Sequence, residues 1–153
     1  MGLMYACQFS SVTVSAIQDL FEITAPSDAI VILHSISIAQ QSDYGDSEAE
    51  GLDVQISRAT GSGSGGSAGT ENPLEVGSPA AGAAVELNNT TQATGTTVLL
   101  ADSFNIQAGW QYRPTPEERI VVSPSGLLVV ELPVAPTDAV EMSGTIIWEE
   151  IGG

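Results

Sequence analysis

The chain has 153 residues, of which 19 are acidic and three are basic, and its formal net charge is −16 at pH 7. Phosphate backbones and anionic lipid surfaces repel such a charge, so we expect neither nucleic acid nor a membrane as a partner. Hydrophobic residues make up 42% of the chain. That is enough for a core, and the length is typical of one domain, so we expect a single domain over residues 1–153.

The single cysteine and the first residues of the chain limit the kinds of site and the cellular compartment that we expect. Cys7 is the only cysteine, which excludes an internal disulfide and a thiolate metal cluster and favours a small buried side chain. Residues 1–14 have neither a basic start nor a continuous apolar run, so we expect that they are not a secretory signal. We therefore expect the protein to be synthesised in a cytoplasm. We expect no cofactor.

Alternation of apolar and polar residues predicts strands through most of the chain. At 28–39 the pattern places one face on Ile30, Ile32, His34, Ile36 and Ile38. The final run, 139–151, places Val140, Met142, Ile146 and Trp148 on one face. Further strands are expected at 10–16, 20–24, 52–57, 96–106, 119–123 and 126–134.

Turn residues separate these runs. The sequence SPSG at 123–126 lies between two apolar runs and predicts a tight hairpin. A short helix would fit residues 15–23, but their β-branched and aromatic end suits a strand equally well. Eight or so short strands with turns between them predict an all-β fold, an antiparallel β-sandwich that we expect to be a jelly roll.

Residues 62–95 interrupt this pattern with glycine, serine, alanine and threonine. Neither flank carries enough strands to fold alone, so we expect one sandwich with a long loop or arm over 59–95. Four spaced apolar residues, which a flexible linker would lack, indicate anchoring: Leu74, Val76, Val85 and Leu87. We also expect residues 1–9 as a possible second arm, and a folded sandwich after deletion of 62–95.

No motif favours catalysis. His34 is the only histidine, so a multi-histidine cupin site is excluded, and no G-x-S-x-G elbow accompanies it. We expect it to be a satisfied core histidine. Glu149 and Glu150 are adjacent in a predicted strand and should face opposite ways, and aromatic residues, at 5%, are few for a glycosidase cleft.

The acidic stretch 42–50 admits two explanations. It carries Asp43, Asp46, Glu48 and Glu50 around a glycine, and oxygen-rich loops of this kind can bind Ca²⁺. The spacing differs from that of an EF-hand loop, so a solvated acidic loop is favoured. The chain is therefore expected to be non-enzymatic and without a metal centre.

Residues 108–119 contain the most distinctive local pattern. Trp110 and Tyr112 alternate, and Arg113 follows them. They form either a rigid loop that covers the core or an interface anchor, because these residue types are enriched at binding hot spots. Arg113 and Arg119 are expected to pair with carboxylates such as Glu117 and Glu118, or with acidic groups of a neighbouring subunit. The candidate interface residues are Trp110, Tyr112, Arg113, Leu74 and Val76.

The segments 18–40 and 131–151, together with the lysine-free acidity and the Gly/Ala/Thr-rich loop, resemble the decoration (cement) proteins of tailed-bacteriophage heads. The resemblance lies in the style of the whole chain. It implies a virion structural protein on the outer capsid surface that binds the major capsid protein. It also implies a homo-oligomer, a trimer being favoured, that bridges neighbouring capsomers through several contacts acting together.

Two other functions remain open from the residues. The first alternative is a carbohydrate- or receptor-binding sandwich module of a phage tail or fibre. An enzyme of cupin or glycosidase type comes third.

Overall fold

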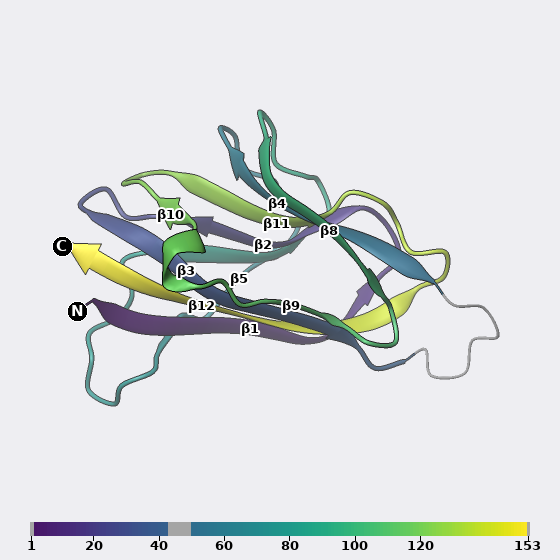
Figure 1. Ribbon diagram of the computed structural model, residues 1–153, viewed down its shortest axis with the longest axis horizontal. Coiled ribbons are helices and arrows are strands. Elements are labelled where there is room, and N and C mark those ends of the chain that lie inside the picture. The colour runs from purple at the N-terminus through teal and green to yellow at the C-terminus, as the bar shows by residue number, and fades with distance from the viewer. Residues whose placement is uncertain (1, 43–49, 153) are drawn as a thin grey trace.

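The computed structural model describes residues 2–42 and 50–152, which form two antiparallel sheets packed face to face (Figure 1). The predicted all-β sandwich is confirmed. Sheet A contains β1 (Leu3–Val14), β3 (Ala29–Gln40), β6 (Asn72–Pro73), β9 (Trp110–Tyr112), β10 (Val121–Val122) and β12 (Val140–Gly152). Sheet B contains β2 (Gln18–Thr24), β4 (Gly51–Ala59), β5 (Ser67–Ala68), β7 (Ala84–Asn89), β8 (Thr97–Asn105) and β11 (Leu127–Leu132).

Helix is almost absent from the described part of the chain. The short helix considered for 15–23 is instead the start of β2, and the 3₁₀ turn η1 (Pro116–Glu118) lies between β9 and β10. None of the described helices has the length and apolar character needed to cross a membrane.

The strands pair in a nested order. Sheet A runs β10-β3-β12-β1-β6, with β9 also beside β3, and sheet B runs β5-β7-β2-β11-β4-β8. Thus β1 pairs with β12, β2 with β11, β3 with β10 and β4 with β8. The chain crosses from one sheet to the other at each step from β1 to β4, so strands distant in sequence become neighbours.

This order corrects the expected hairpin at 123–126. The turn is tight, since the Gly126 N–H donates to the Ser123 carbonyl at 2.8 Å. Its two flanking strands, however, belong to different sheets, because β10 pairs with β3 and β11 pairs with β2 and β4. The turn therefore joins the two layers of the sandwich.

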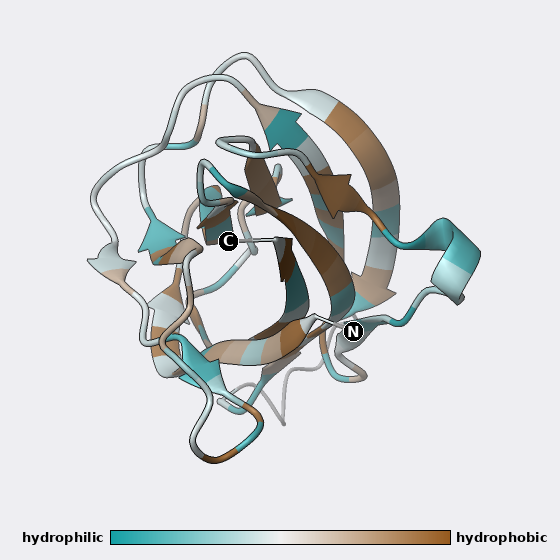
Figure 2. Ribbon diagram, turned by 90° about the vertical axis from the view of Figure 1, so that its left-hand side faces the viewer, coloured by the Kyte–Doolittle hydropathy of each residue, from teal (hydrophilic) through white to brown (hydrophobic). Residues whose placement is uncertain are grey.

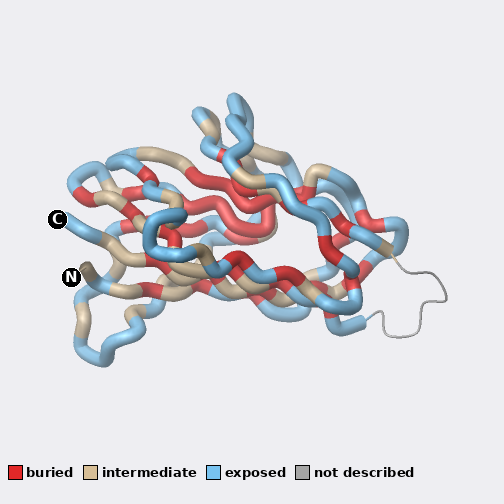
Figure 3. The backbone as a smooth tube through the Cα atoms, in the orientation of Figure 1, coloured by how far each residue is buried: buried red, intermediate tan, exposed pale blue. Residues whose placement is uncertain are grey.

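The core lies between the sheets and is formed by alternate residues of each strand. The predicted inward face of β12 is confirmed, because its four residues Val140, Met142, Ile146 and Trp148 are each at most 1% exposed. The Trp148 ring stacks on Tyr5 of β1, with centroids 5.9 Å apart. Cys7 is buried and free, as expected. Figure 3 shows the buried segments concentrated in the middle strands of both sheets.

The predicted inward face of β3 is wrong at its start. Val31 and Leu33 are fully buried there, whereas Ile32 and His34 lie on the outer side. The cause is a β-bulge: Leu33 pairs with Trp148 and Ser35 with Ile147, which leaves His34 as the extra residue. A bulge shifts the alternation by one residue, so the buried set continues at Ile36 and Ile38.

Both expected arms prove to be built into the sheets. Residues 3–9 of the N-terminal segment belong to β1 and pair with β12 from Leu3 onward. Within 59–95, residues 84–89 form β7, which pairs with β2 in sheet B. Val85 and Leu87 of this strand are 2% and 7% exposed and belong to the core.

Residues 67–83 of the 59–95 stretch lie along one side of the sandwich. Residues 67–68 pair with β7 at the edge of sheet B, and residues 72–73 pair with β1 at the edge of sheet A. The chain then projects as a loop before it enters β7; this loop lies at the lower left of Figure 1. Deletion of 62–95 would therefore remove core residues and a sheet strand, contrary to the expectation that the sandwich would stay folded.

This assignment is tested by two valine substitutions in the same stretch. Val85→Ala should lower the free energy of unfolding by about 2 kcal/mol, because it removes two buried methyl groups and leaves a cavity. Val76→Ala should leave it unchanged, because Val76 is fully exposed. Urea unfolding followed by tryptophan fluorescence measures both. Equal effects of the two substitutions would contradict the placement of β7.

Candidate functional site

The outer face of sheet A is the most distinctive surface of the molecule. Cross-strand pairing places Gln8, Thr145, Ser37 and Gln111 in one row across four strands. A second row is Ala6, Ile147 and Ser35. A third row is Met4, Glu149, Ile32 and Val121. We call these three rows the neutral face.

The neutral face carries one acidic side chain, Glu149, in a chain of net charge −16. Glu149 Oε2 lies 3.0 Å from His34 Nε2, and its Oε1 accepts the Gly2 N–H at 2.7 Å. The Gly2 N–H and then the His34 side chain hold the pKa of Glu149 below its ordinary value. The face is thus close to uncharged, with an apolar half around Ile147 and a hydroxyl- and amide-bearing half around Thr145.

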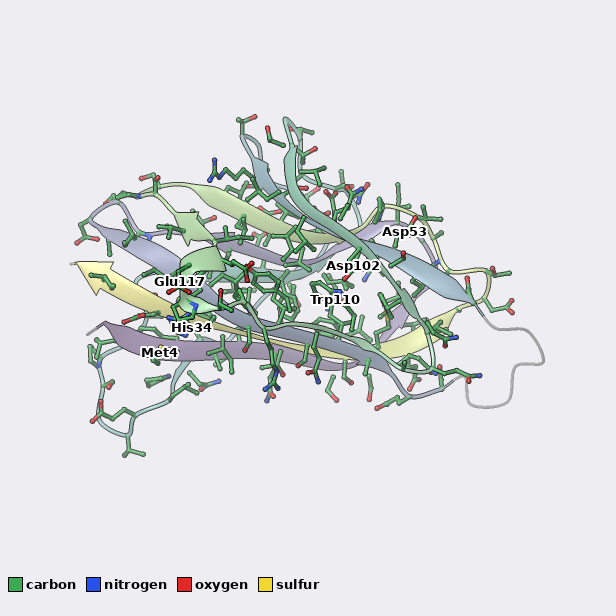
Figure 4. All side chains as sticks on the ribbon, viewed as in Figure 1. Met4, His34, Asp53, Asp102, Trp110 and Glu117 are labelled. Atoms are coloured by element: carbon green, nitrogen blue, oxygen red, sulfur yellow. The ribbon has the colours of Figure 1, made fainter. Side chains whose placement is uncertain are left out.

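His34 is not the core histidine that the sequence predicts. The bulge in β3 turns its ring to the outer side, where it is 20% exposed and pairs with Glu149. Figure 4 shows His34 in front of β3, away from the space between the sheets. No other histidine exists, and none of the described residues gathers three or more metal-ligating side chains in a group that could hold a metal ion.

The acidic stretch considered for Ca²⁺ lies mostly outside the described residues, because these omit 43–49. Glu50 is described, and its carboxylate accepts the Thr137 N–H. That contact holds the start of β4 to the connection between β11 and β12.

The predicted interface residues occupy two separate places. Trp110 and Tyr112 are buried, at 6% and 8% exposure, and their rings stack with centroids 6.4 Å apart. Trp110 Nε1 donates to Asp102 of β8 at 3.0 Å, which links sheet A to sheet B across the edge (Figure 4). Both aromatic rings thus cover the core. Of the three candidates Trp110, Tyr112 and Arg113, only Arg113 is exposed.

Leu74 and Val76 lie beyond β6, at the other edge of sheet A from β9 and β10. They are 55% and 102% exposed. The loop that carries them is fixed at several points, since the Leu74 N–H donates to Met4, and Tyr5 donates to the Pro79 carbonyl. Glu150 accepts the N–H groups of residues 82 and 83 at the end of the loop.

The outer face of sheet B differs from the neutral face because it carries several acidic side chains. Asp19, Glu22 and Glu131 lie on it, are at most 7% exposed, and make no ion pair within the described residues. Each instead accepts a hydrogen bond from the stretch 60–66 or 89–95, which covers them. The donors are Ala93 N–H to Asp19, Gly63 N–H and Asn89 Nδ2 to Glu22, and Gln92 Nε2 to Glu131.

Glycine is required where this cover meets the carboxylates. A Cβ on Gly63 would lie 2.5 Å from the Thr91 carbonyl and 3.1 Å from Asp19 Oδ2. A Cβ on Gly66 would lie 2.2 Å from the Leu87 carbonyl. The small residues of this stretch therefore serve close backbone approach to its own sheet.

Among the three carboxylates, the charge of Asp19 is in an unfavourable environment. Burial raises the pKa of Asp19 from 3.8 to about 6; the Ala93 N–H opposes this shift, and the negative charges of Glu131 and Glu22 add to it. Asp19 Oδ1 is buried without a hydrogen-bond partner. A buried carboxyl with a raised pKa binds its proton more tightly in the folded state than in the unfolded state. It therefore stabilises the fold below about pH 4, and this contribution is lost as the pH rises through about 6.

The unfavourable environment of Asp19 predicts a stabilising substitution. Asp19→Asn keeps an acceptor for the Ala93 N–H and removes the charge. Relative to wild type it should gain about 2–3 kcal/mol in free energy of unfolding between pH 4 and pH 7. Asp53→Asn, on the exposed surface of β4, is the matched control and should show no such pH-dependent gain. Urea titrations at pH 4, 5, 6 and 7 measure both; a gain for Asp19→Asn that does not change with pH would contradict the assignment.

Comparison with known proteins identifies no relative: no protein-family model, no curated protein and no solved structure matches the chain. The surfaces of the two sheets are therefore the features from which a function can be proposed. Sequence reasoning missed the neutral face, because its rows depend on strand register. The separate acidic residues 19, 22 and 131 carried no signal that they meet on one face, since pairing of β2 with β11 brings them together.

Proposed function

We propose that this chain is a non-enzymatic structural protein of a tailed-phage virion, which binds the outside of the capsid and stabilises it by bridging neighbouring capsomers. The resemblance of its sequence to head decoration proteins supports the proposal. We further propose that the sandwich is a jelly roll, because pairing of first with last, second with second-last and so on is what a hairpin wrapped into two sheets produces. That architecture is common in viral capsid and lectin domains.

The observation that carries the proposal is the neutral face. Burying a charged group against a partner requires removal of its water, and this costs several kcal/mol unless the charge is paired. A chain of net charge −16 therefore docks most cheaply through a surface without charge. The neutral face offers Ile32, Ile147 and Met4 for apolar contact, and hydroxyl and amide groups for hydrogen bonds beside them.

The distribution of the other carboxylates fits this orientation. With the neutral face on the shell, sheet B points to the medium together with its exposed carboxylates, such as Asp53 of β4 and Glu86 of β7. Strong like charge on the exposed side keeps decorated particles apart and soluble. Oligomerisation, with a trimer favoured, would add the contacts of several copies on adjacent capsomers, so that modest individual contacts give tight binding.

A matched pair of threonine substitutions tests the docking face. Thr145→Glu places a charge in the first row of the neutral face, and Thr24→Glu places the same charge at the end of β2 on sheet B. With cognate heads that lack the protein, we expect Thr145→Glu to weaken co-sedimentation at least tenfold, and Thr24→Glu to bind like wild type.

The same particles test the stabilising role. Heads decorated with wild-type protein should resist heat or low salt better than undecorated heads, and heads mixed with Thr145→Glu should behave as undecorated ones. Failure of the wild-type protein to bind cognate heads would overturn the proposal. Equal loss of binding in both threonine variants would overturn the assignment of the face.

A specific feature favours the carbohydrate-binding alternative. The row Gln8–Thr145–Ser37–Gln111 lines a shallow hollow of about 330 Å³ on the neutral face. Uncharged hydroxyl and amide groups are suitable partners for sugar hydroxyls. The aromatic rings at this hollow, Phe9 and Trp110, are buried and offer little stacking surface, so this function ranks second.

Glycan-array binding of the purified chain tests the alternative. Under it, the double change Gln8→Ala and Gln111→Ala should abolish binding to a defined glycan and should leave head stability unaffected. Head binding without any glycan signal would exclude it.

A further inference from the structure

All three arginines lie along one flank of the sandwich, where β8 of sheet B faces β9 and β10 of sheet A. Arg58 lies at the end of β4 next to β8, and Arg113 and Arg119 flank η1. The expected pairing of Arg113 and Arg119 with Glu117 and Glu118 is not observed: within the described residues, no arginine side chain has an ion pair or hydrogen-bond partner. Arg119 Nε is even buried without one.

This arginine flank is hollowed and partly apolar. A hollow of about 380 Å³ is lined by Leu99, Leu100, Tyr112 and Arg113, with Asp102 and Glu118 also in its lining. Asp102 is engaged by the Trp110 Nε1–H and Glu118 by the Thr115 hydroxyl. A second hollow of about 380 Å³ is lined by Arg58, Val122 and Leu127 among others. Val98 and Leu99 of β8 are 48% and 38% exposed. On the other flank, residues 67–68 and 72–73 extend the edges of both sheets. On the arginine flank, β8 is an edge strand that pairs only with β4 among the described residues.

The complementary feature is the loop at the other edge of sheet A. Its tip, Leu74-Glu75-Val76, presents two exposed apolar side chains with an exposed carboxylate between them. The tip is preformed, because the Ser78 N–H donates to the Glu75 carbonyl and the Leu74 N–H to Met4. We call residues 74–76 the acidic knob. In Figure 2 the loop projects at the bottom of the molecule, and η1 lies at the right.

We propose that the acidic knob of one copy of this chain docks into the arginine flank of the next copy. Leu74 and Val76 enter the apolar hollows, and Glu75 pairs with the unpartnered Arg113. A second copy is the occupant because this chain itself carries both the apolar anchors and the opposite charge. The inference depends on these two surfaces and not on capsid binding.

The positions of the two surfaces determine the type of assembly. They lie at opposite edges of sheet A, so the knob and the flank of one copy contact two different neighbours. Such a contact is heterologous, and it forms a ring when the rotation between copies closes and a filament when it does not. The acidic net charge of each copy limits growth, and we expect a closed ring of at least three chains.

The test uses the full chain and one variant of each surface. Val76→Asn removes the more exposed of the two apolar side chains of the acidic knob, and Arg113→Glu repels Glu75 of the incoming copy. Light scattering coupled to size exclusion should give a ring mass for wild type and, for each variant, at least tenfold weaker association with monomers predominating. Val134→Asn, which alters another exposed valine between β11 and β12, is the matched control and should retain the ring mass.

Mixing the two variants is the decisive step. The Val76→Asn chain keeps an intact flank and the Arg113→Glu chain keeps an intact knob, so an equimolar mixture should form heterodimers of twice the monomer mass and stop there. A mixture that stays monomeric, a monomeric wild type, or a Val76→Asn chain with the wild-type mass would overturn the inference. Unfolding curves identical to wild type show that the variants fold. Neither variant alters the neutral face, so monomeric variants should still bind phage heads weakly. Loss of assembly with head binding retained would therefore concern only this inference, whereas loss of head binding by wild type would concern the proposed function.

Discussion

The structure depends on the antiparallel pairing of β12 with both β1 and β3. This strand runs through the middle of sheet A and contributes the fully buried Trp148 to the core. Its other side, from Thr145 to Glu149, supplies the centre of the neutral face. One strand therefore sets both the packing between the sheets and the register of the surface that we propose for docking. The single irregularity in its pairing with β3, at His34, places the chain's only histidine beside Glu149 on that surface.

Polar contacts organise the other sheet. Three buried carboxylates on its outer face accept hydrogen bonds from a stretch with almost no apolar content: Glu22 and Asp19 from backbone N–H groups, and Glu131 from the Gln92 side-chain amide. These contacts order the stretch without a hydrophobic anchor of its own. The cost is the crowding of like charges around Asp19. This arrangement explains why glycine is abundant at 61–66: a side chain at Gly63 or Gly66 would separate the N–H donors from their acceptors.

Alternation predicted the sandwich because most strands bury one face, as the four inward residues of β12 do. It failed where pairing is irregular or purely polar. The bulge at His34 changes which residues of β3 point into the core, and no local sequence pattern predicts it. The sequence places residues 84–89 in the long loop, with Val85 and Leu87 as anchors, because small and polar residues surround them. Pairing with β2 makes them a strand. Of the candidate interface residues that the sequence suggests, Arg113, Leu74 and Val76 are exposed. For Trp110 and Tyr112 the sequence left two explanations open, and the burial of both rings agrees with the one in which they cover the core. The choice depends on the pairing of β9 with β3, which no local pattern predicts.

The nested strand order also has a consequence for the newly made chain. Strand β1 is synthesised before its long partner β12, which lies more than a hundred residues later in the chain. Contacts of such separation close large loops and slow folding. Strand β1 therefore cannot pair with β12 until residues 140–152 have been synthesised, and its apolar side chains stay exposed to water until then. During that interval the many carboxylates of the intervening chain keep the nascent polypeptide soluble by mutual repulsion. The acidity that seems a property of the finished surface thus also protects the unfinished fold.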